Sequence, residues 1–276
     1  MTDSEFLRLN DGRQMPQFGF GVWQIPPAET TQAVTAALDT GFRLIDTAAA
    51  YGNEAEVGQA VNGGGAKREG VFVTTKLANP AHGFDEALRA FDKSLGLLGA
   101  QEVDLYLIHW PRPVHNRYVE TWRALVRLKE EGRARSIGVS NFTEEHLQRL
   151  VDETGVVPAV NQVELHPQFQ QRPLREFHAR HGIVTQSWSP LGRGRVTEDP
   201  VITAIAAKHG RSWAQVALRW HLQSGLSAIT RSVSPARIRE NHATLGFTLD
   251  DDDMARLATL DRPDGRIGAH PNDWGN

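Results

Sequence analysis

The sequence predicts an α/β protein with a (β/α)8 TIM barrel and a short N-terminal β-hairpin closing the barrel's lower end. Short apolar, β-rich runs alternate with amphipathic helical stretches along the whole chain, and eight such runs are present. Nearly continuous apolar strands joined by helices are typical of a parallel sheet covered by helices. Eight units of this kind close most naturally into a barrel.

The predicted elements follow one another in a regular order. A hairpin over residues 6–16, with Asp11-Gly12 as its turn, precedes the first strand. The predicted strands are 18–22, 43–47, 71–76, 103–109, 136–141, 159–164, 183–188 and 227–231. Helical patterns lie at 29–41, 85–99, 118–132, 143–155, 174–182 and 213–225. Several of them end at the glycine expected just past a helix terminus.

Length and composition favour a single soluble domain with a sizeable hydrophobic core. The chain has 276 residues, of which 40% are hydrophobic, and it contains no linker or low-complexity tract, so we expect one domain over 1–276. The absence of cysteine excludes disulfides, thiolate metal sites and a cysteine nucleophile, and fits a reducing compartment. We therefore expect a cytoplasmic protein, and a soluble one because no signal peptide or membrane span is recognisable. A net charge of -3 gives no reason to expect nucleic acid.

Polar side chains follow three successive predicted strands at the points where these strands end. Asp46 ends the second strand, Lys76 the third and His109 the fourth, while Tyr51 lies on the loop after the second. Each has a structural alternative: a helix cap, a solvated strand end, a buried histidine or a turn aromatic. Active sites of such barrels gather at the carboxyl ends of the strands, and the coincidence on neighbouring strands therefore favours a shared site.

These four residue types together suit proton delivery. A tyrosine has a pKa of about 10, and an adjacent ammonium is expected to stabilise the phenolate and lower that pKa toward neutrality. Asp46 would pair with Lys76, and His109 would orient a substrate oxygen. Proton delivery to an oxygen indicates carbonyl reduction, which requires a hydride-carrying cofactor. No G-x-G-x-x-G opens a helix after a strand, so a Rossmann crevice is not supported.

Strand ends in the second half of the chain offer residues for such a cofactor. Ser140, Asn141 and Gln162 could bond a carboxamide, and Trp188 could stack on a nicotinamide ring. The loop 189–194 could wrap a pyrophosphate, and 230–241 opens a helix with nearby arginines, which is typical of an anion site. Each loop taken alone could also be an ordinary turn. The candidate set is Ser140, Asn141, Gln162, Trp188, Leu191, Gly192, Arg193, Arg231, Ser232, Val233, Arg237, Glu240 and Asn241.

Along essentially its whole length the chain resembles the aldo-keto reductase superfamily. The stretches GFRLIDTAAAYGNEAEVGQAV, LVRLKEEGRARSIGVSNF and ITRSVSPARIRENHATL look like the three signatures of that family, and the first includes Asp46 and Tyr51. Lys76 in TTKL and His109 in LIHWP match its other two catalytic positions. The phrases VVPAVNQVELHPQFQQR, SWSPLGRG and GRIGAHP are most similar to the bacterial branch of 2,5-diketo-D-gluconate reductases.

The resemblance implies an oxidoreductase of the alcohol dehydrogenase type that binds NADPH across the barrel mouth. The nicotinamide hydride would go to a small aldehyde or ketone, and Tyr51 would give the proton without any metal. Trp23 and Trp110 should line the carbonyl site together with Tyr51 and His109, and Trp274 is a candidate to close over it. No obligate protein partner is implied.

Two departures from the pattern concern specificity. Ala78 stands where the branch often has tryptophan, which widens the expected pocket. Thr230-Arg231 replaces the usual Pro-Lys of the phosphate segment, and arginine keeps a charge that can fork onto phosphate.

Two other functional interpretations stay open. The first is a hydrolase or isomerase barrel that uses Asp46 and His109, although the sequence shows no H-x-H and no carboxylates clustered at metal-ligand spacing. The second is a non-catalytic, NADP(H)-sensing regulatory subunit of the same fold, against which the complete set of four candidate catalytic residues argues.

Overall fold

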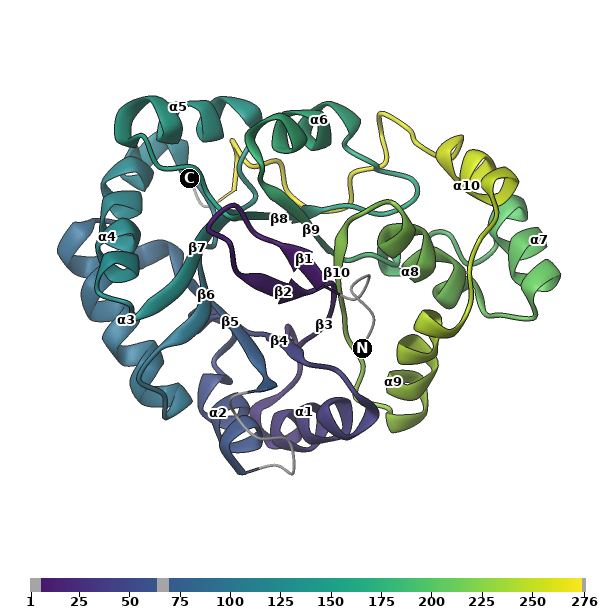
Figure 1. Ribbon diagram of the computed structural model, residues 1–276, viewed down its shortest axis with the longest axis horizontal. Coiled ribbons are helices and arrows are strands. Elements are labelled where there is room, and N and C mark those ends of the chain that lie inside the picture. The colour runs from purple at the N-terminus through teal and green to yellow at the C-terminus, as the bar shows by residue number, and fades with distance from the viewer. Residues whose placement is uncertain (1–5, 64–69, 275–276) are drawn as a thin grey trace.

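A closed barrel of eight parallel strands forms the centre of the molecule (Figure 1). The computed structural model describes residues 6–63 and 70–274. Neighbours around the barrel follow the order β10-β3-β4-β5-β6-β7-β8-β9, and the predicted fold class is therefore confirmed. The strands are β3 (Phe18–Gly21), β4 (Leu44–Asp46), β5 (Phe72–Leu77), β6 (Val103–Ile108), β7 (Ala134–Ser140), β8 (Val160–Glu164), β9 (Val184–Trp188) and β10 (Ser227–Thr230).

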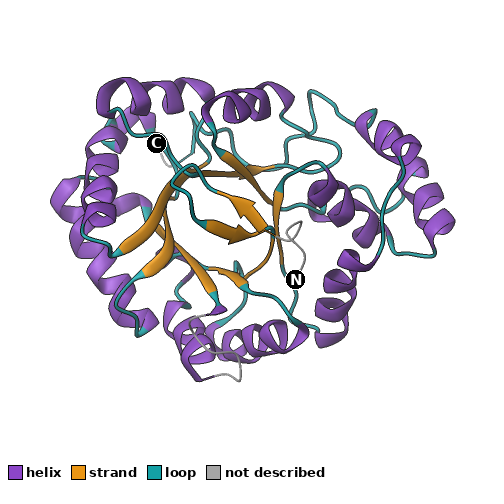
Figure 2. Ribbon diagram, viewed as in Figure 1, coloured by secondary structure: helices purple, strands orange, loops and turns teal. Residues whose placement is uncertain are grey.

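Helices surround the strands on the outside (Figure 2). They are α1 (Pro27–Thr40), α2 (Glu54–Gly63), α3 (Phe84–Leu98), α4 (Tyr118–Glu130), α5 (Glu144–Thr154), α6 (Arg172–His181), α7 (Pro200–His209), α8 (Trp213–Gln223), α9 (Pro235–His242) and α10 (Asp251–Ala258). The six predicted helices are all present. Residues with side-chain caps, Asp199 and Asp250, begin α7 and α10, which the sequence patterns did not resolve.

The N-terminal hairpin closes the amino-terminal end of the barrel, as expected. Strands β1 (Phe6–Arg8) and β2 (Gln14–Pro16) pair antiparallel and lie across the barrel opening in Figure 1. The buried side chains of Leu9 and Met15 pack against Leu44 and Phe72, the first residues of β4 and β5. The hairpin therefore fills the lower end with apolar side chains, and the opposite end of the barrel is the mouth.

Two glycines in β3 serve the packing of the barrel interior. A Cβ atom added at Gly21 would lie 2.6 Å from Cγ2 of Ile229, and one at Gly19 would overlap the side chain of Leu44. Larger residues would displace neighbouring strands, because barrel interiors are already filled. The glycines of FGFGV are thus explained by close packing, in agreement with the absence of a Rossmann motif.

Non-glycine residues with left-handed backbone conformations cluster at the mouth of the barrel. Left-handed φ angles are rare for residues with a side chain and cluster at functional sites. In the described part of the chain every such residue lies on a loop that leaves the carboxyl end of a strand: Gln24, Arg112, Asn116, Asn141, Gln171, Ser189 and Arg193. This distribution points to the mouth as the functional end.

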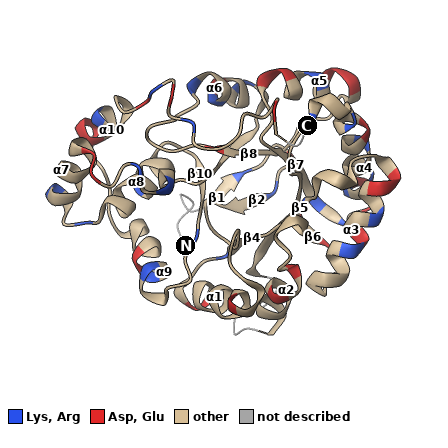
Figure 3. Ribbon diagram, turned by 180° about the vertical axis from the view of Figure 1, so that it is seen from behind, with Lys and Arg blue, Asp and Glu red and all other residues tan. Residues whose placement is uncertain are grey.

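Charged residues are frequent on the helices that surround the barrel. Figure 3 shows Lys, Arg, Asp and Glu distributed along the outer helices, with both signs on α3, α4 and α5. None of the helices in the described ranges has the length and apolar character needed to cross a bilayer.

Candidate active site

Lys76 lies near the carboxyl end of β5 and is fully buried. Its Nζ is 2.6 Å from Asp46 Oδ2, 2.9 Å from the carbonyl oxygen of Thr47 and 3.3 Å from the hydroxyl of Tyr51. These three acceptors match the three protons of an ammonium group. The pair of Lys76 and Asp46 is therefore a buried ion pair with good geometry, and Tyr51 is joined to it.

His109 completes the group of four residues that the sequence predicts. Tyr51 ends the short 3-10 helix η2 (Ala49–Tyr51), and its ring centroid lies 5.6 Å from that of His109 in an edge-on arrangement. Segments far apart in sequence thus bring an acid, a phenol, an ammonium and an imidazole into contact range.

The electrostatics of this group differ from the expectation in one respect. Burial raises the pKa of Tyr51, and the nearby charge of Lys76 lowers it by less, so that the net shift is upward. Lys76 thus shifts the pKa of Tyr51 in the expected direction, but burial outweighs it, and the expected fall of the pKa toward neutrality does not occur in this geometry. The phenol keeps its proton at neutral pH and can act as a donor.

The other two groups have defined protonation states. Burial opposes the charge of Lys76, but Asp46 and Tyr51 together outweigh it and raise the pKa of the ammonium. Burial, with help from the charge of Lys76, lowers the pKa of His109 to about 3. His109 is consequently a neutral imidazole at pH 7, able to donate one hydrogen bond.

A chain of amides fixes the second oxygen of Asp46. The Nε2 group of Gln162 donates to Asp46 Oδ1 at 2.8 Å and to Gln186 Oε1 at 2.7 Å. Gln186 in turn donates to Ser227 Oγ at 3.0 Å. Gln162, predicted as a carboxamide ligand, therefore also orients Asp46 through its nitrogen. Sequence reasoning missed Gln186, whose only signal is its position as an inward-facing polar residue in β9.

Three further predicted residues are linked to one another around the mouth. Asn141, with φ at +64°, donates from Nδ2 to the carbonyl oxygen of His109 and to Ser140 Oγ, both at 3.0 Å. Trp188 donates from its indole nitrogen to Asn141 Oδ1 at 2.8 Å. Its ring is thereby held in one orientation by a residue that also bonds the backbone of His109.

The loops after β3, β9 and β10 meet at Trp23. The guanidinium of Arg193 lies 5.4 Å above the ring of Trp23, and Arg231 donates from Nη1 to the Trp23 carbonyl oxygen at 3.2 Å. Arg193 belongs to the 3-10 helix η6 (Gly192–Gly194), which follows Leu191. Trp23, predicted to line the carbonyl site, thus also contacts two of the residues predicted to bind phosphate groups.

Some polar side chains of the segment before and within α9 form hydrogen bonds within that segment. Ser232 Oγ accepts from the backbone of Ser234, and Asn241 donates to Thr230 Oγ1 at 3.0 Å in a buried position. Arg237 is exposed, and among the described residues its guanidinium has no partner. Two more predicted residues, Val233 and Glu240, are also exposed.

Trp110 and Trp274 lie together at the mouth. Their ring centroids are 5.4 Å apart with an interplanar angle of 44°. The C-terminal tail therefore reaches the loop after β6, as the sequence suggests.

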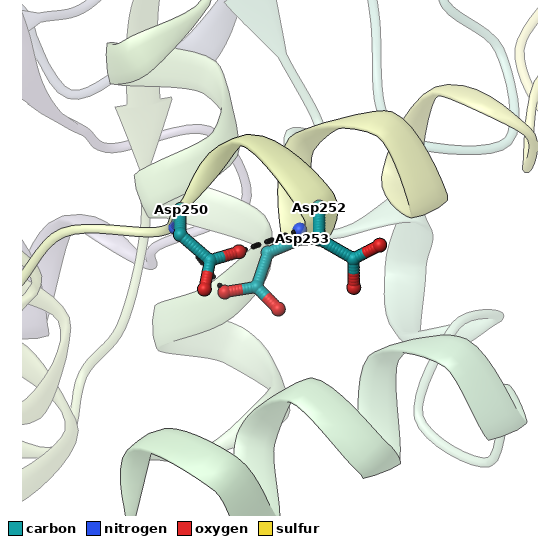
Figure 4. A group of neighbouring side chains, drawn as sticks. All are labelled: Asp250, Asp252 and Asp253. Atoms are coloured by element: carbon teal, nitrogen blue, oxygen red, sulfur yellow. Dashed lines mark hydrogen bonds between the residues drawn. The ribbon is translucent and has the colours of Figure 1, made fainter.

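The expectation that no carboxylates cluster was wrong. Asp250, Asp252 and Asp253 at the start of α10 bring carboxylate oxygens close together (Figure 4). Asp250 caps the helix by accepting from the backbone of Asp253 at 2.9 Å. Lys208 lies 2.5 Å from Asp250 and 2.9 Å from Asp253, and His209 lies 2.6 Å from Asp253. These contacts give the cluster a capping and ion-pairing role away from the mouth.

Comparisons with known proteins find similar sequences and similar structures. The family model described as Aldo/keto reductase family matches residues 15–262. Methylglyoxal reductase DkgA of Escherichia coli (strain K12) is 47% identical over 277 residues, covering 100% of both chains. A crystal structure of a Gox0644 mutant in complex with NADPH is 53% identical, with a TM-score of 0.94 and 97% of each chain covered. The structure of a putative 2,5-diketo-D-gluconic acid reductase B is 37% identical, with a TM-score of 0.89, covering 92% of this chain and 91% of the other.

Proposed function

The chain belongs to the aldo/keto reductase family, and from this membership we propose that it reduces small aldehydes or ketones to alcohols with NADPH. The single observation that carries the proposal is the contact of Lys76 with both Asp46 and Tyr51 in the barrel mouth. This arrangement holds a protonated phenol beside a fixed positive charge. The NADPH complex of the Gox0644 mutant and the name of the methylglyoxal reductase relative support the cofactor and the substrate class.

The residues of the mouth have separate proposed roles. A bound nicotinamide cofactor supplies the hydride. Tyr51 donates its proton to the carbonyl oxygen, and Lys76 stabilises the phenolate that remains. Asp46 keeps Lys76 charged and in place, while neutral His109 donates a hydrogen bond that orients the substrate oxygen.

The chain offers suitable partners for each part of NADPH. Trp188 presents an indole ring held by Asn141. The side-chain nitrogen of Gln162 bonds Asp46 and Gln186, and its side-chain oxygen makes no hydrogen bond within the described residues. Positive charge from Arg193, Arg231 and Arg237 is available for the phosphate groups. The remaining predicted residues are proposed to complete this site: Ser140, Leu191, Gly192, Ser232, Val233, Glu240 and Asn241.

The direct test is consumption of NADPH in the presence of an activated carbonyl such as methylglyoxal or a nitrobenzaldehyde. We expect the absorbance of NADPH to fall, and the rate to be unaffected by a chelator, since the proposed chemistry uses only the nicotinamide hydride and the side chains of the mouth. A protein that leaves NADPH unchanged with a panel of aldehydes, α-keto esters and diketones would contradict the proposal. Activity that requires an added divalent ion would contradict its metal-free part.

Cofactor selectivity is expected to depend on Arg231 and Arg237. Charge-assisted hydrogen bonds contribute about 1.5 to 3 kcal/mol each, so replacing both by alanine should raise the NADPH dissociation constant at least tenfold more than that of NADH. Both constants can be measured by quenching of tryptophan fluorescence. Arg239→Ala is the matched control, because Arg239 is an exposed arginine of the same helix. An unchanged ratio in the double variant would show that these arginines do not contact the 2′-phosphate.

A further inference from the structure

Glu164 is a buried carboxylate that binds the C-terminal tail. It ends β8 and is only 1% exposed. Its Oε1 accepts the backbone N–H of Ile267 at 2.6 Å, and its Oε2 accepts that of Gly268 at 2.7 Å. The ring of buried His166 also approaches, with Nε2 3.3 Å from Oε1. Short bonds from two successive amides to an ionised acceptor are among the strong hydrogen bonds of proteins.

The charge of this carboxylate is maintained in spite of its burial. Burial acts to raise the pKa of Glu164, but the hydrogen bonds from His166 and from the two tail amides outweigh it, and the pKa is lowered. An ionised carboxylate that lost these donors inside the protein would be strongly destabilised. The tail is therefore held by more than surface contacts.

The tail segment held by Glu164 touches Trp188. A Cβ atom added at Gly268 would lie 2.6 Å from Cη2 of Trp188 and 2.8 Å from Oε2 of Glu164. The backbone at Gly268 consequently packs directly against the benzo edge of the indole. The nitrogen of the five-membered ring of the same indole is fixed by its bond to Asn141. Both rings of the Trp188 indole are thus restrained.

The same tail continues to the carbonyl side of the mouth. Upstream, Arg262 donates a backbone hydrogen bond to Gln168, and Asp261 accepts one from Gln170, both from the loop after β8. Figure 1 shows the yellow C-terminal segment leaving α10 and passing α6 toward α5. Downstream, Trp274, the last described residue, lies against Trp110. Glu164 therefore holds the middle of a segment that spans both halves of the proposed site.

We propose that Glu164 is a positioning residue that seats the tail against Trp188, and thereby controls both the nicotinamide-stacking surface and the cover of the carbonyl site. The inference rests on the proposed function for its effect on NADPH and substrate. The anchoring of the tail by Glu164 is a property of the ligand-free protein and can be measured separately.

The first experiment uses the full-length protein without ligand. Glu164→Gln keeps the shape of the side chain, but its amide presents an N–H group to one of the two tail donors. Hydrogen exchange of a peptide containing Ile267 and Gly268 is expected to become at least tenfold faster in this variant, while peptides from β5 and β6 keep their wild-type rates. Glu145→Gln, at an exposed position in α5, is the matched control. Wild-type exchange at the tail of the Glu164 variant overturns the proposal.

The second experiment measures binding and turnover. In Glu164→Gln we expect the NADPH dissociation constant and the KM for methylglyoxal each to rise at least tenfold, and the pH profile of kcat to stay unchanged because the Tyr51–Lys76 contact is untouched. A purely structural role would not separate KM from the kcat profile in this way. Constants within twofold of wild type, in a variant with a freed tail, also overturn the proposal.

Gly268→Ala tests the same contact with the carboxylate intact. Its added Cβ should displace the Trp188 ring and weaken NADPH binding in the same direction. The double variant should lose less than the sum of the two single effects, because both act through one contact. If Glu164→Gln does not fold, unchanged NADPH binding by Gly268→Ala overturns the proposal. Failure of the proposed function is a distinct result: wild-type protein would bind no NADPH, whereas the tail exchange is measured without it.

Discussion

Tyr51→Phe is expected to lower turnover by about 10² or more while NADPH still binds with nearly wild-type affinity. The change keeps the ring beside His109 and removes only the hydroxyl that lies 3.3 Å from Lys76. A positioned general acid typically contributes between about 10² and 10⁴ in rate. The measurement is kcat for methylglyoxal reduction, together with the NADPH dissociation constant from fluorescence quenching.

Tyr106→Phe is the matched control for this prediction. Tyr106 is fully buried in β6, and within the described residues its hydroxyl makes no hydrogen bond. The same chemical change at that position should leave turnover unchanged and should not lower stability. Turnover of Tyr51→Phe within a few-fold of wild type would show that the proton comes from another group.

Acidification is expected to unfold the protein with a midpoint above about pH 4, because the unfolded chain takes up protons on histidines that are buried and neutral in the folded state. Burial is the main cause that lowers the pKa of five histidines, to about 3 for His109, His178 and His221 and to about 4 for His82 and His146. In the unfolded chain the same side chains have pKa values of about 6.5. The unfolded state therefore binds protons that the folded state does not.

This difference in proton binding makes the free energy of unfolding fall as the pH falls. The stabilisation is fully present above about pH 6.5 and is lost as the pH falls toward the folded-state values, by about 1.4 kcal/mol per pH unit for each histidine. Since domains are typically stable by about 5–15 kcal/mol, we expect the acid unfolding midpoint to lie above about pH 4. Urea unfolding at a series of pH values between 6.5 and 5 gives the slope.

A single buried histidine can be removed to check the origin of that slope. His178 lies between Thr185 and Asn161, 2.8 Å and 3.0 Å away. A glutamine at this position can hydrogen-bond and does not titrate. His178→Gln should therefore lower the proton uptake on unfolding by about one. A free energy of unfolding that is flat between pH 6.5 and 5 would contradict the buried, neutral state of these side chains.

The fold was largely predictable because the chain repeats one local pattern. All eight strands were predicted within two residues of their observed bounds, since apolar strands and amphipathic helices have different periods. Helix α7 was missed because its sequence PVITAIAAKH is apolar with little periodicity, and α10 because it begins with three acids, Asp251 to Asp253. In both cases the cap, Asp199 or Asp250, was the available signal.

The candidate site was predictable as a set of residues but not as a network. Positions at strand ends grouped Asp46, Lys76 and His109, because parallel strands deliver their ends to one side of a barrel. The dominance of burial over charge in the pKa of Tyr51 depends on the depth of the site, which has no sequence signal. The contacts of Glu164 with the tail join residues 103 and 104 positions apart, and local pattern carries no information on such pairs.

The apolar side chains of Leu9 and Met15, which fill the lower end of the barrel, affect the order of steps in the proposed reaction. Because apolar side chains fill the lower end of the barrel, water would reach Tyr51 from the side of the mouth, where the alcohol of the proposed reaction would also form. The hydroxyl of Tyr51 would be reprotonated through the same opening by which the alcohol leaves. Reprotonation of Tyr51 and release of the alcohol would therefore share one path. Slow release of the alcohol would also delay reprotonation of Tyr51 before the next carbonyl binds.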